Sequence, residues 1–120
     1  MLKINNKIKL VDIASNILDD AKAEKIRVVN LENKTSIADY FIIATCRSNR
    51  HANATADDLI KKLKTIGIIC PNPEGRPKCD WIIVDAGSVI IHLFRSEIRE
   101  VYNLEKLWNM TFDPVENNLA

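Results

Sequence analysis

The segment Trp81-Ile-Ile-Val-Asp-Ala-Gly-Ser-Val-Ile-Ile-His-Leu-Phe94 decides how this chain folds. Residues 81–85 and 89–94 are rich in β-branched and aromatic side chains, and the Ala86-Gly87-Ser88 sequence between them is typical of a hairpin turn. Both strands are apolar at consecutive positions, so we expect both faces of the hairpin to be covered. Helices can cover one face, and we interpret the other face as a surface for a protein partner.

The residues before this hairpin predict two helices and two further strands. Apolar residues at helical spacing predict a helix from Leu10 to Ala21, after a loose start at residues 1–7. Strands are expected over residues 26–31 and 40–45. Ser48 or Asn49 is expected to cap a second helix, which ends at Gly67. Ile66 is expected to be the last residue of its buried stripe. Residues 70–78, which are rich in proline, predict a loop.

After the hairpin, Ser96 is expected to cap a helix over residues 97–103, with another turn or two as far as Trp108. The order α-β-β-α-β-β-α predicts an α/β (α+β) fold: a single domain over residues 1–109, with a mixed sheet of about four to five strands and helices packed on it. Residues 110–120 are expected to form a flexible C-terminal tail. The strand over 40–45, the helix after it and the strand over 81–85 are expected to form one right-handed β-α-β unit.

The composition excludes several functional classes. The chain has 120 residues, which fits one domain, and a formal net charge of +1, which argues against a general nucleic-acid binder. We expect no signal peptide and no membrane span. The three cysteines form no Cys-x-x-Cys pair, which favours free thiols and a cytoplasmic location.

The turn from Thr45 to His51 could carry chemistry, because a helix N-terminus attracts anions and this one has Arg47 and Arg50 beside it. A nucleotidyltransferase has a Gly-Ser turn here and paired carboxylates on a nearby strand. Asp80 and Asp85 are five residues apart and are expected to point to opposite faces, so they cannot share a metal ion. A small nucleotide-binding enzyme of this type stays an alternative, and a capped helix with solvated arginines is the simpler interpretation.

Two other reactive arrangements are weak. Cys46 and His51 could form a thiolate–imidazole pair, but no third orienting group is evident. Zinc would need Cys70, Cys79, His51 and His92 to converge, and their spacing matches no zinc module. We therefore expect no catalytic residue, no metal and no cofactor.

Several aromatic residues are candidates either for the core or for an interface. His92 lies in the middle of a strand, where a hydrogen-bonded structural histidine is more common than a catalyst. Trp81, Tyr102 and Trp108 fit core packing as well as the interface role in which Trp and Tyr dominate binding energy.

Together these residues form a familiar pattern, which runs from near Ile17 to Trp108. The chain resembles the ribosomal silencing factor family (RsfS, also called Iojap). The matching pieces are Leu18-Asp-Asp-Ala-Lys-Ala-Glu24, Ala38-Asp-Tyr-Phe-Ile-Ile-Ala-Thr45, Ser48-Asn-Arg-His51, Glu74-Gly75, Trp81-Ile-Ile-Val-Asp85, Val89-Ile-Ile-His-Leu-Phe94, Arg99 and Tyr102-x-Leu-Glu-x-Leu-Trp108.

The resemblance implies a fold similar to nucleotidyltransferases without their catalytic residues, and a protein that is not an enzyme. It also implies a homodimer that binds protein fourteen of the large ribosomal subunit, blocks joining of the small subunit and represses translation when nutrients are scarce. Relatives in organelles are associated with assembly of the large subunit, which is a second alternative. A module for RNA binding is a third, which the neutral charge disfavours.

We select residues for the partner-binding surface that could bury area against the partner or supply complementary charge. They are Trp81, Asp85, His92, Arg99, Tyr102, Leu104, Glu105 and Trp108. Two positions depart from the family pattern. Cys46 and Arg47 stand where the family usually has a Gly-Thr pair, and Lys78 and Cys79 stand near a position where a glycine is common before the tryptophan.

Overall fold

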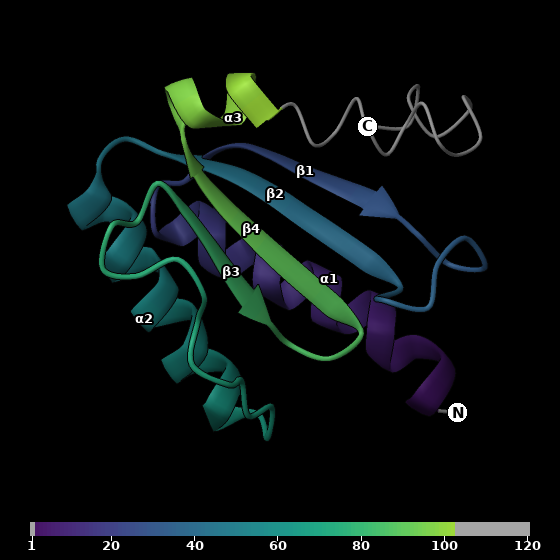
Figure 1. Ribbon diagram of the computed structural model, residues 1–120. Coiled ribbons are helices and arrows are strands. Elements are labelled where there is room, and N and C mark those ends of the chain that lie inside the picture. Colours follow the sequence, from purple (N-terminus) through teal and green to yellow (C-terminus); the bar gives the residue numbers. More distant parts are fainter. Residues whose placement is uncertain (1, 103–120) are drawn as a thin grey trace.

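The computed structural model describes the backbone of residues 2–102 and the side chains of residues 9–100 (Figure 1). Its elements follow the predicted order and confirm a mixed α/β fold with one four-stranded sheet. They are α1 (Leu2–Asp20), β1 (Glu24–Asn30), β2 (Tyr40–Cys46), α2 (Asn49–Thr65), β3 (Trp81–Asp85), β4 (Val89–Arg95) and α3 (Ser96–Tyr102).

The strands lie in the order β1-β2-β4-β3, with β2 and β4 parallel and the other two pairs antiparallel. The predicted β-α-β unit is therefore wrong in its last strand, because β4 and not β3 is the parallel neighbour of β2. The physical reason is burial: the longer β4 is buried at five of its seven positions and takes the central place. The shorter β3 ends in Asp85 and lies at the edge, where the backbone of Glu74 pairs with that of Ile83.

Helices α1 and α2 pack on the same side of the sheet, which we call the inner face (Figure 1). Alternate residues of each strand point to this side, as the period of two requires. Ile42, Ala44, Ile82, Ile91 and Leu93 are fully buried there against Leu18 of α1 and Leu59 of α2. This inner layer is the larger part of the core.

The opposite side, which we call the outer face, has a core of its own. Phe41, Ile43 and Phe94 are buried there, and Trp81 and Ile98 pack against them half-buried. Because Ile98 belongs to α3, this short helix covers one end of the outer face. The expectation that a partner must cover the whole outer face is therefore corrected: the chain itself buries the centre of that face.

The helix ends agree with most of the local signals. Ser48 caps α2 by accepting a hydrogen bond from the backbone N–H of His51 at 3.0 Å, and Gly67 follows the helix with φ +90. The expected loose start is wrong, since α1 begins at Leu2. Adding turns to a helix already packed on a sheet is inexpensive because its nucleus exists.

Candidate functional site

Trp81 on β3 and His92 on β4 meet on the outer face. The indole Nε1 of Trp81 donates a hydrogen bond to Nδ1 of His92 at 3.1 Å. Phe94 stacks on the indole at 4.9 Å between ring centroids, and Phe41 meets the imidazole edge-on at 4.5 Å. Two of the residues that we selected from the sequence are thus brought together in one aromatic cluster.

Within this cluster His92 is neutral. It is 5% exposed, and burial lowers the pKa of its imidazole from 6.5 to about 4. Since Nδ1 accepts the indole hydrogen, the ring proton is on Nε2. Nε2 is buried and has no hydrogen-bond partner among the described residues. The cluster therefore contains one buried polar atom that the packing leaves unsatisfied.

A cleft of about 350 Å³ lies beside Trp81, between the end of the loop before β3 and the first turn of α3. Trp81 and Ile98 are its apolar walls, and Arg76 and Lys78 border it with positive charge. Asp80 also lines it and is held by Arg95, whose guanidinium nitrogens lie 2.8 and 2.9 Å from Oδ1. The cleft is open on a surface where a partner side chain could enter.

The geometry of this cleft depends on Gly75. Its φ is +103, a region that side chains other than glycine rarely adopt, and a Cβ there would overlap the carbonyl oxygen of Trp81. The nearby Cys79 has φ +63 although it is not a glycine. The resemblance placed a family glycine close to this position, and the backbone explains why one is favoured there.

The other selected residues lie apart from the Trp81–His92 pair. Asp85 is exposed at the far end of β3, about 13 Å along the strand, and accepts a hydrogen bond from the backbone N–H of Gly87. Arg99 is 9% exposed and donates to Thr45 and to the backbone of Lys25. The side chain of Tyr102 lies outside the described residues, as do Leu104, Glu105 and Trp108.

The turn between β2 and α2 uses its polar groups internally. Nδ1 of His51 accepts a hydrogen bond from the N–H of Arg47 at 3.0 Å, and Nε2 lies 2.7 Å from the carbonyl oxygen of Ala21. Burial raises the pKa of the Cys46 thiol to about 11. Neither group is available as the partner of a thiolate–imidazole pair. The backbone at Cys46 and Arg47 is not left-handed, so the absence of a Gly-Thr pair introduces no strain.

The remaining candidates for chemistry are dispersed. Among residues 9–100 no group of three His, Cys, Asp or Glu side chains comes together as a metal site would require. Asp80 directly precedes β3 and Asp85 is its last residue, and Asp80 is paired with Arg95. Over the same described range, no helix is both long and apolar enough to cross a bilayer.

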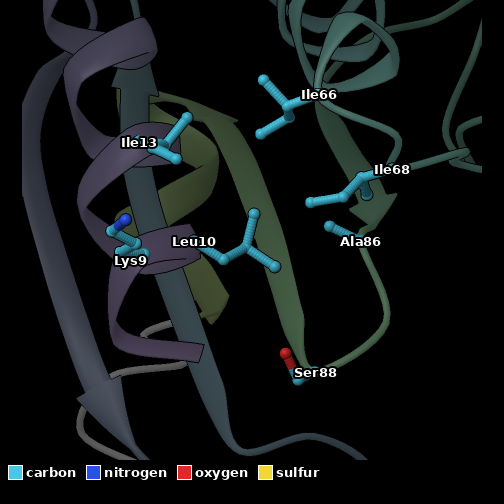
Figure 2. Close-up of a pocket in the computed structure, with 7 residues that line it drawn as sticks. All are labelled: Lys9, Leu10, Ile13, Ile66, Ile68, Ala86 and Ser88. Carbon is cyan, nitrogen blue, oxygen red and sulfur yellow. The ribbon is translucent and has the colours of Figure 1, made fainter. Parts of the chain in front are cut away.

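The sequence reasoning missed a groove of about 450 Å³ on the helical side (Figure 2). It lies between α1, the end of α2 and the β3–β4 turn, and it is lined by Lys9, Leu10, Ile13, Ile66, Ile68, Ala86 and Ser88. Ile66 was assigned to the buried stripe and is instead 49% exposed. The apolar pair Ile68-Ile69, which continues past the helix end at Gly67, was the signal that could have indicated this groove.

Comparison with known proteins identifies relatives over most of the chain. The model of a family described as "Ribosomal silencing factor during starvation" matches residues 4–119. The chain is 43% identical to the ribosomal silencing factor RsfS of Zymomonas mobilis, over 82% of this chain and 74% of that protein. It is 40% identical to the RsfS of Haemophilus influenzae, over 82% and 97% of the two chains.

A mouse protein named "Mitochondrial assembly of ribosomal large subunit protein 1" is 36% identical, over 86% of this chain and 47% of its own length. Two solved structures are also similar. A Chromobacterium violaceum protein aligns with a TM-score of 0.81 at 33% identity, over 84% of each chain. A Bacillus halodurans protein aligns with a TM-score of 0.75 at 35% identity, over 83% of this chain and 93% of its own.

Proposed function

Because this chain belongs to the ribosomal silencing factor (RsfS) family, we propose that it binds the large ribosomal subunit and excludes the small subunit by occupying the joining surface. Protein fourteen of the large subunit is the proposed contact, as the resemblance implies. Translation then falls when nutrients are scarce. The mechanism is steric, and no covalent bond is made or broken. The proposed location is the cytoplasm, in agreement with the free thiols of Cys46, Cys70 and Cys79.

One observation on the outer face carries the choice of docking surface. Trp81 is half-buried and is held from two sides, by the hydrogen bond to His92 and by the stack on Phe94. A large aromatic side chain on a rigid strand that keeps part of its surface accessible is the usual anchor of a protein interface. Asp85, exposed on the same strand, adds a charge that can fix orientation.

The test combines sedimentation with large subunits and a subunit-joining assay. We expect the protein to co-sediment with large subunits and to lower the yield of joined ribosomes. Trp81→Ala and Asp85→Lys should weaken both effects. Ile69→Ala is the matched control, because Ile69 is 71% exposed and follows the groove-lining Ile68 on the helical side. An unchanged yield of joined ribosomes at saturating protein would refute the proposal.

Assembly of the large subunit is the second candidate, and the name of the mouse relative favours it. In this case the same docking would take place on an immature particle. Cells that lack the protein should then accumulate precursors of the large subunit on sucrose gradients during rapid growth. If cells that lack the protein show a normal gradient during growth and an excess of joined ribosomes in starvation, silencing is the main role.

The nucleotide-binding enzyme has less support. Its turn at Arg47–His51 is used for internal hydrogen bonds, and Asp80 is engaged by Arg95. A thermal-shift screen with nucleotides and magnesium should therefore show no stabilisation. The alternative of an RNA-binding module would be supported only if the protein bound naked ribosomal RNA with an affinity that falls steeply as the salt concentration rises.

The proposal includes a homodimer, for which the groove of Figure 2 is the candidate contact. The groove lies on the helical side, away from Trp81, so a second copy there does not compete with the large subunit. Ile66→Asp should shift the sedimentation coefficient to that of a monomer. Ile37→Asp, at a position that is 59% exposed in the connection between β1 and β2, is the control. A wild-type protein that sediments as a monomer would refute the dimer.

A further inference from the structure

The pairing of β3 with β4 places Trp81 and His92 as diagonal neighbours. Trp81 lies directly opposite Phe94, and His92 lies directly opposite Ile83. Diagonal side chains on one face of an antiparallel pair are within reach of aromatic groups, and the two ring centroids are 6.0 Å apart. The hairpin register alone therefore brings the indole N–H to the imidazole.

We propose that His92 is a positioning residue for partner binding: its unprotonated Nδ1 accepts the indole hydrogen of Trp81 and fixes the indole as one wall of the cleft between residues 75–81 and Ile98. This inference rests on the proposed function, since the partner is the large subunit. His92 itself is buried and acts through Trp81. The cleft fits a partner side chain with an apolar part, which Trp81 and Ile98 would contact, while Arg76, Lys78 and Asp80 line the rest of the cleft with charge.

The surroundings of His92 keep Nδ1 available as an acceptor. Phe41 lies edge-on to the imidazole, and Phe94 is nearly parallel to it at 6.3 Å between centroids. These apolar neighbours disfavour the imidazolium form, in agreement with the pKa of about 4. An imidazolium would carry hydrogens on both nitrogens and would point one of them at the indole N–H. The packing thus selects the protonation state that holds Trp81.

A fixed indole matters because binding must immobilise it. A side chain that already occupies its bound rotamer loses less conformational entropy when the partner docks. Phe94 restrains the indole from one side by stacking, and His92 restrains its edge by a directed hydrogen bond. Loss of the directed contact should weaken binding by roughly 3- to 10-fold, without abolishing it.

The experiment compares His92→Leu with His92→Asn. Leucine fills space but accepts no hydrogen bond, whereas the amide oxygen of asparagine can stand close to the position of Nδ1. Affinity for large subunits should fall 3- to 10-fold in His92→Leu, and His92→Asn should regain most of the loss. The indole N–H resonance of Trp81, assigned with a Trp108→Phe variant, should shift in His92→Leu and return toward its wild-type position in His92→Asn. The nitrogen spectrum of wild-type His92 should show the proton on Nε2.

A second variant removes the same hydrogen bond from its other end. Trp81→Phe keeps an aromatic wall but has no N–H, so it should weaken binding as well, and His92→Leu should add little in that background. If His92→Leu does not fold, Trp81→Phe and the nitrogen spectrum of wild-type His92 keep the inference testable. Wild-type affinity in Trp81→Phe, or in a folded His92→Leu, would overturn the positioning role while leaving the proposed function intact. A wild-type protein that does not bind large subunits would overturn both.

Discussion

A guanidinium nitrogen of Arg99 lies 2.8 Å from the hydroxyl oxygen of Thr45, and it also donates to the carbonyl oxygen of Lys25 at 2.8 Å. These contacts join α3 to β2 and to β1, more than fifty residues earlier in the chain. They place the first turn of α3 on the outer face, beside the cleft that Trp81 lines. The position of that cleft therefore depends on an arginine that points inward.

Replacing Arg99 by methionine should lower the free energy of unfolding by about 2–3 kcal/mol, because hydrogen bonds from a charged group are lost in a buried place. Thr45→Val is the milder comparison, since the bond to Lys25 remains, and it should cost about 1 kcal/mol. Urea unfolding measures both. Equal stability of Arg99→Met and the wild type would contradict this structural role.

Gly75 and Gly67 offer a matched pair of glycines with left-handed backbone. Gly67 has no heavy atom near the position of an added Cβ, whereas a Cβ on Gly75 would overlap the backbone of Trp81. Gly67→Ala should therefore cost about 1–2 kcal/mol from backbone strain alone, and Gly75→Ala should cost more. Gly75→Ala should also weaken binding to large subunits, because the overlap displaces Trp81. Equal losses of stability in the two variants would show that the close approach has no consequence.

Local signals in the sequence were sufficient for most of the elements. The hairpin of β3 and β4 follows from two apolar runs around Ala86-Gly87-Ser88, and the ends of α2 follow from Ser48 and Gly67. Each of these features is decided by residues a few positions apart. The family resemblance used the same short motifs and was confirmed by the comparisons.

Features that depend on distant residues could not be predicted in the same way. The insertion of β4 between β2 and β3 depends on which strand gains most from burial on both faces. The inward direction of Arg99 depends on Thr45 and Lys25, which no spacing rule connects to it. Ile66 fits the helical stripe, but it lies beyond the end of the packed helix, where the groove leaves it exposed.

The three cysteines should differ in their reaction with iodoacetamide. Cys46 and Cys79 are buried, and burial raises the pKa of the Cys46 thiol to about 11. Cys70 is half-buried, and its pKa is raised by burial and by the charge of Asp85. At pH 8 we expect Cys70 to be labelled first, because access limits the other two. Mass spectrometry of peptides over time measures this order, and labelling in urea, where the three rates should converge, is the control. Fast labelling of Cys46 in the folded protein would contradict this order and would support the interpretation of Cys46 as a reactive thiol.

His92 should make stability depend on pH in a defined window. Burial lowers its pKa from 6.5 to about 4 in the folded chain, and the unfolded chain has the ordinary value. Between these values the unfolded chain binds a proton that the folded chain does not. The stabilising effect of a neutral His92 is therefore complete above pH 6.5 and is lost as the pH falls toward 4.

The size of this loss follows from the shift, at about 1.4 kcal/mol for each pKa unit, and amounts to roughly 3 kcal/mol over the whole window. Other groups that titrate in acid are common to the wild type and to His92→Asn, so the difference between the two proteins isolates His92. Between pH 7 and pH 4.5 the free energy of unfolding, measured in urea, should fall about 2–3 kcal/mol further in the wild type than in His92→Asn. Parallel curves for the two proteins would mean that folding does not lower the pKa of His92, and the buried surroundings and the hydrogen bond to Trp81 would then not favour the neutral form.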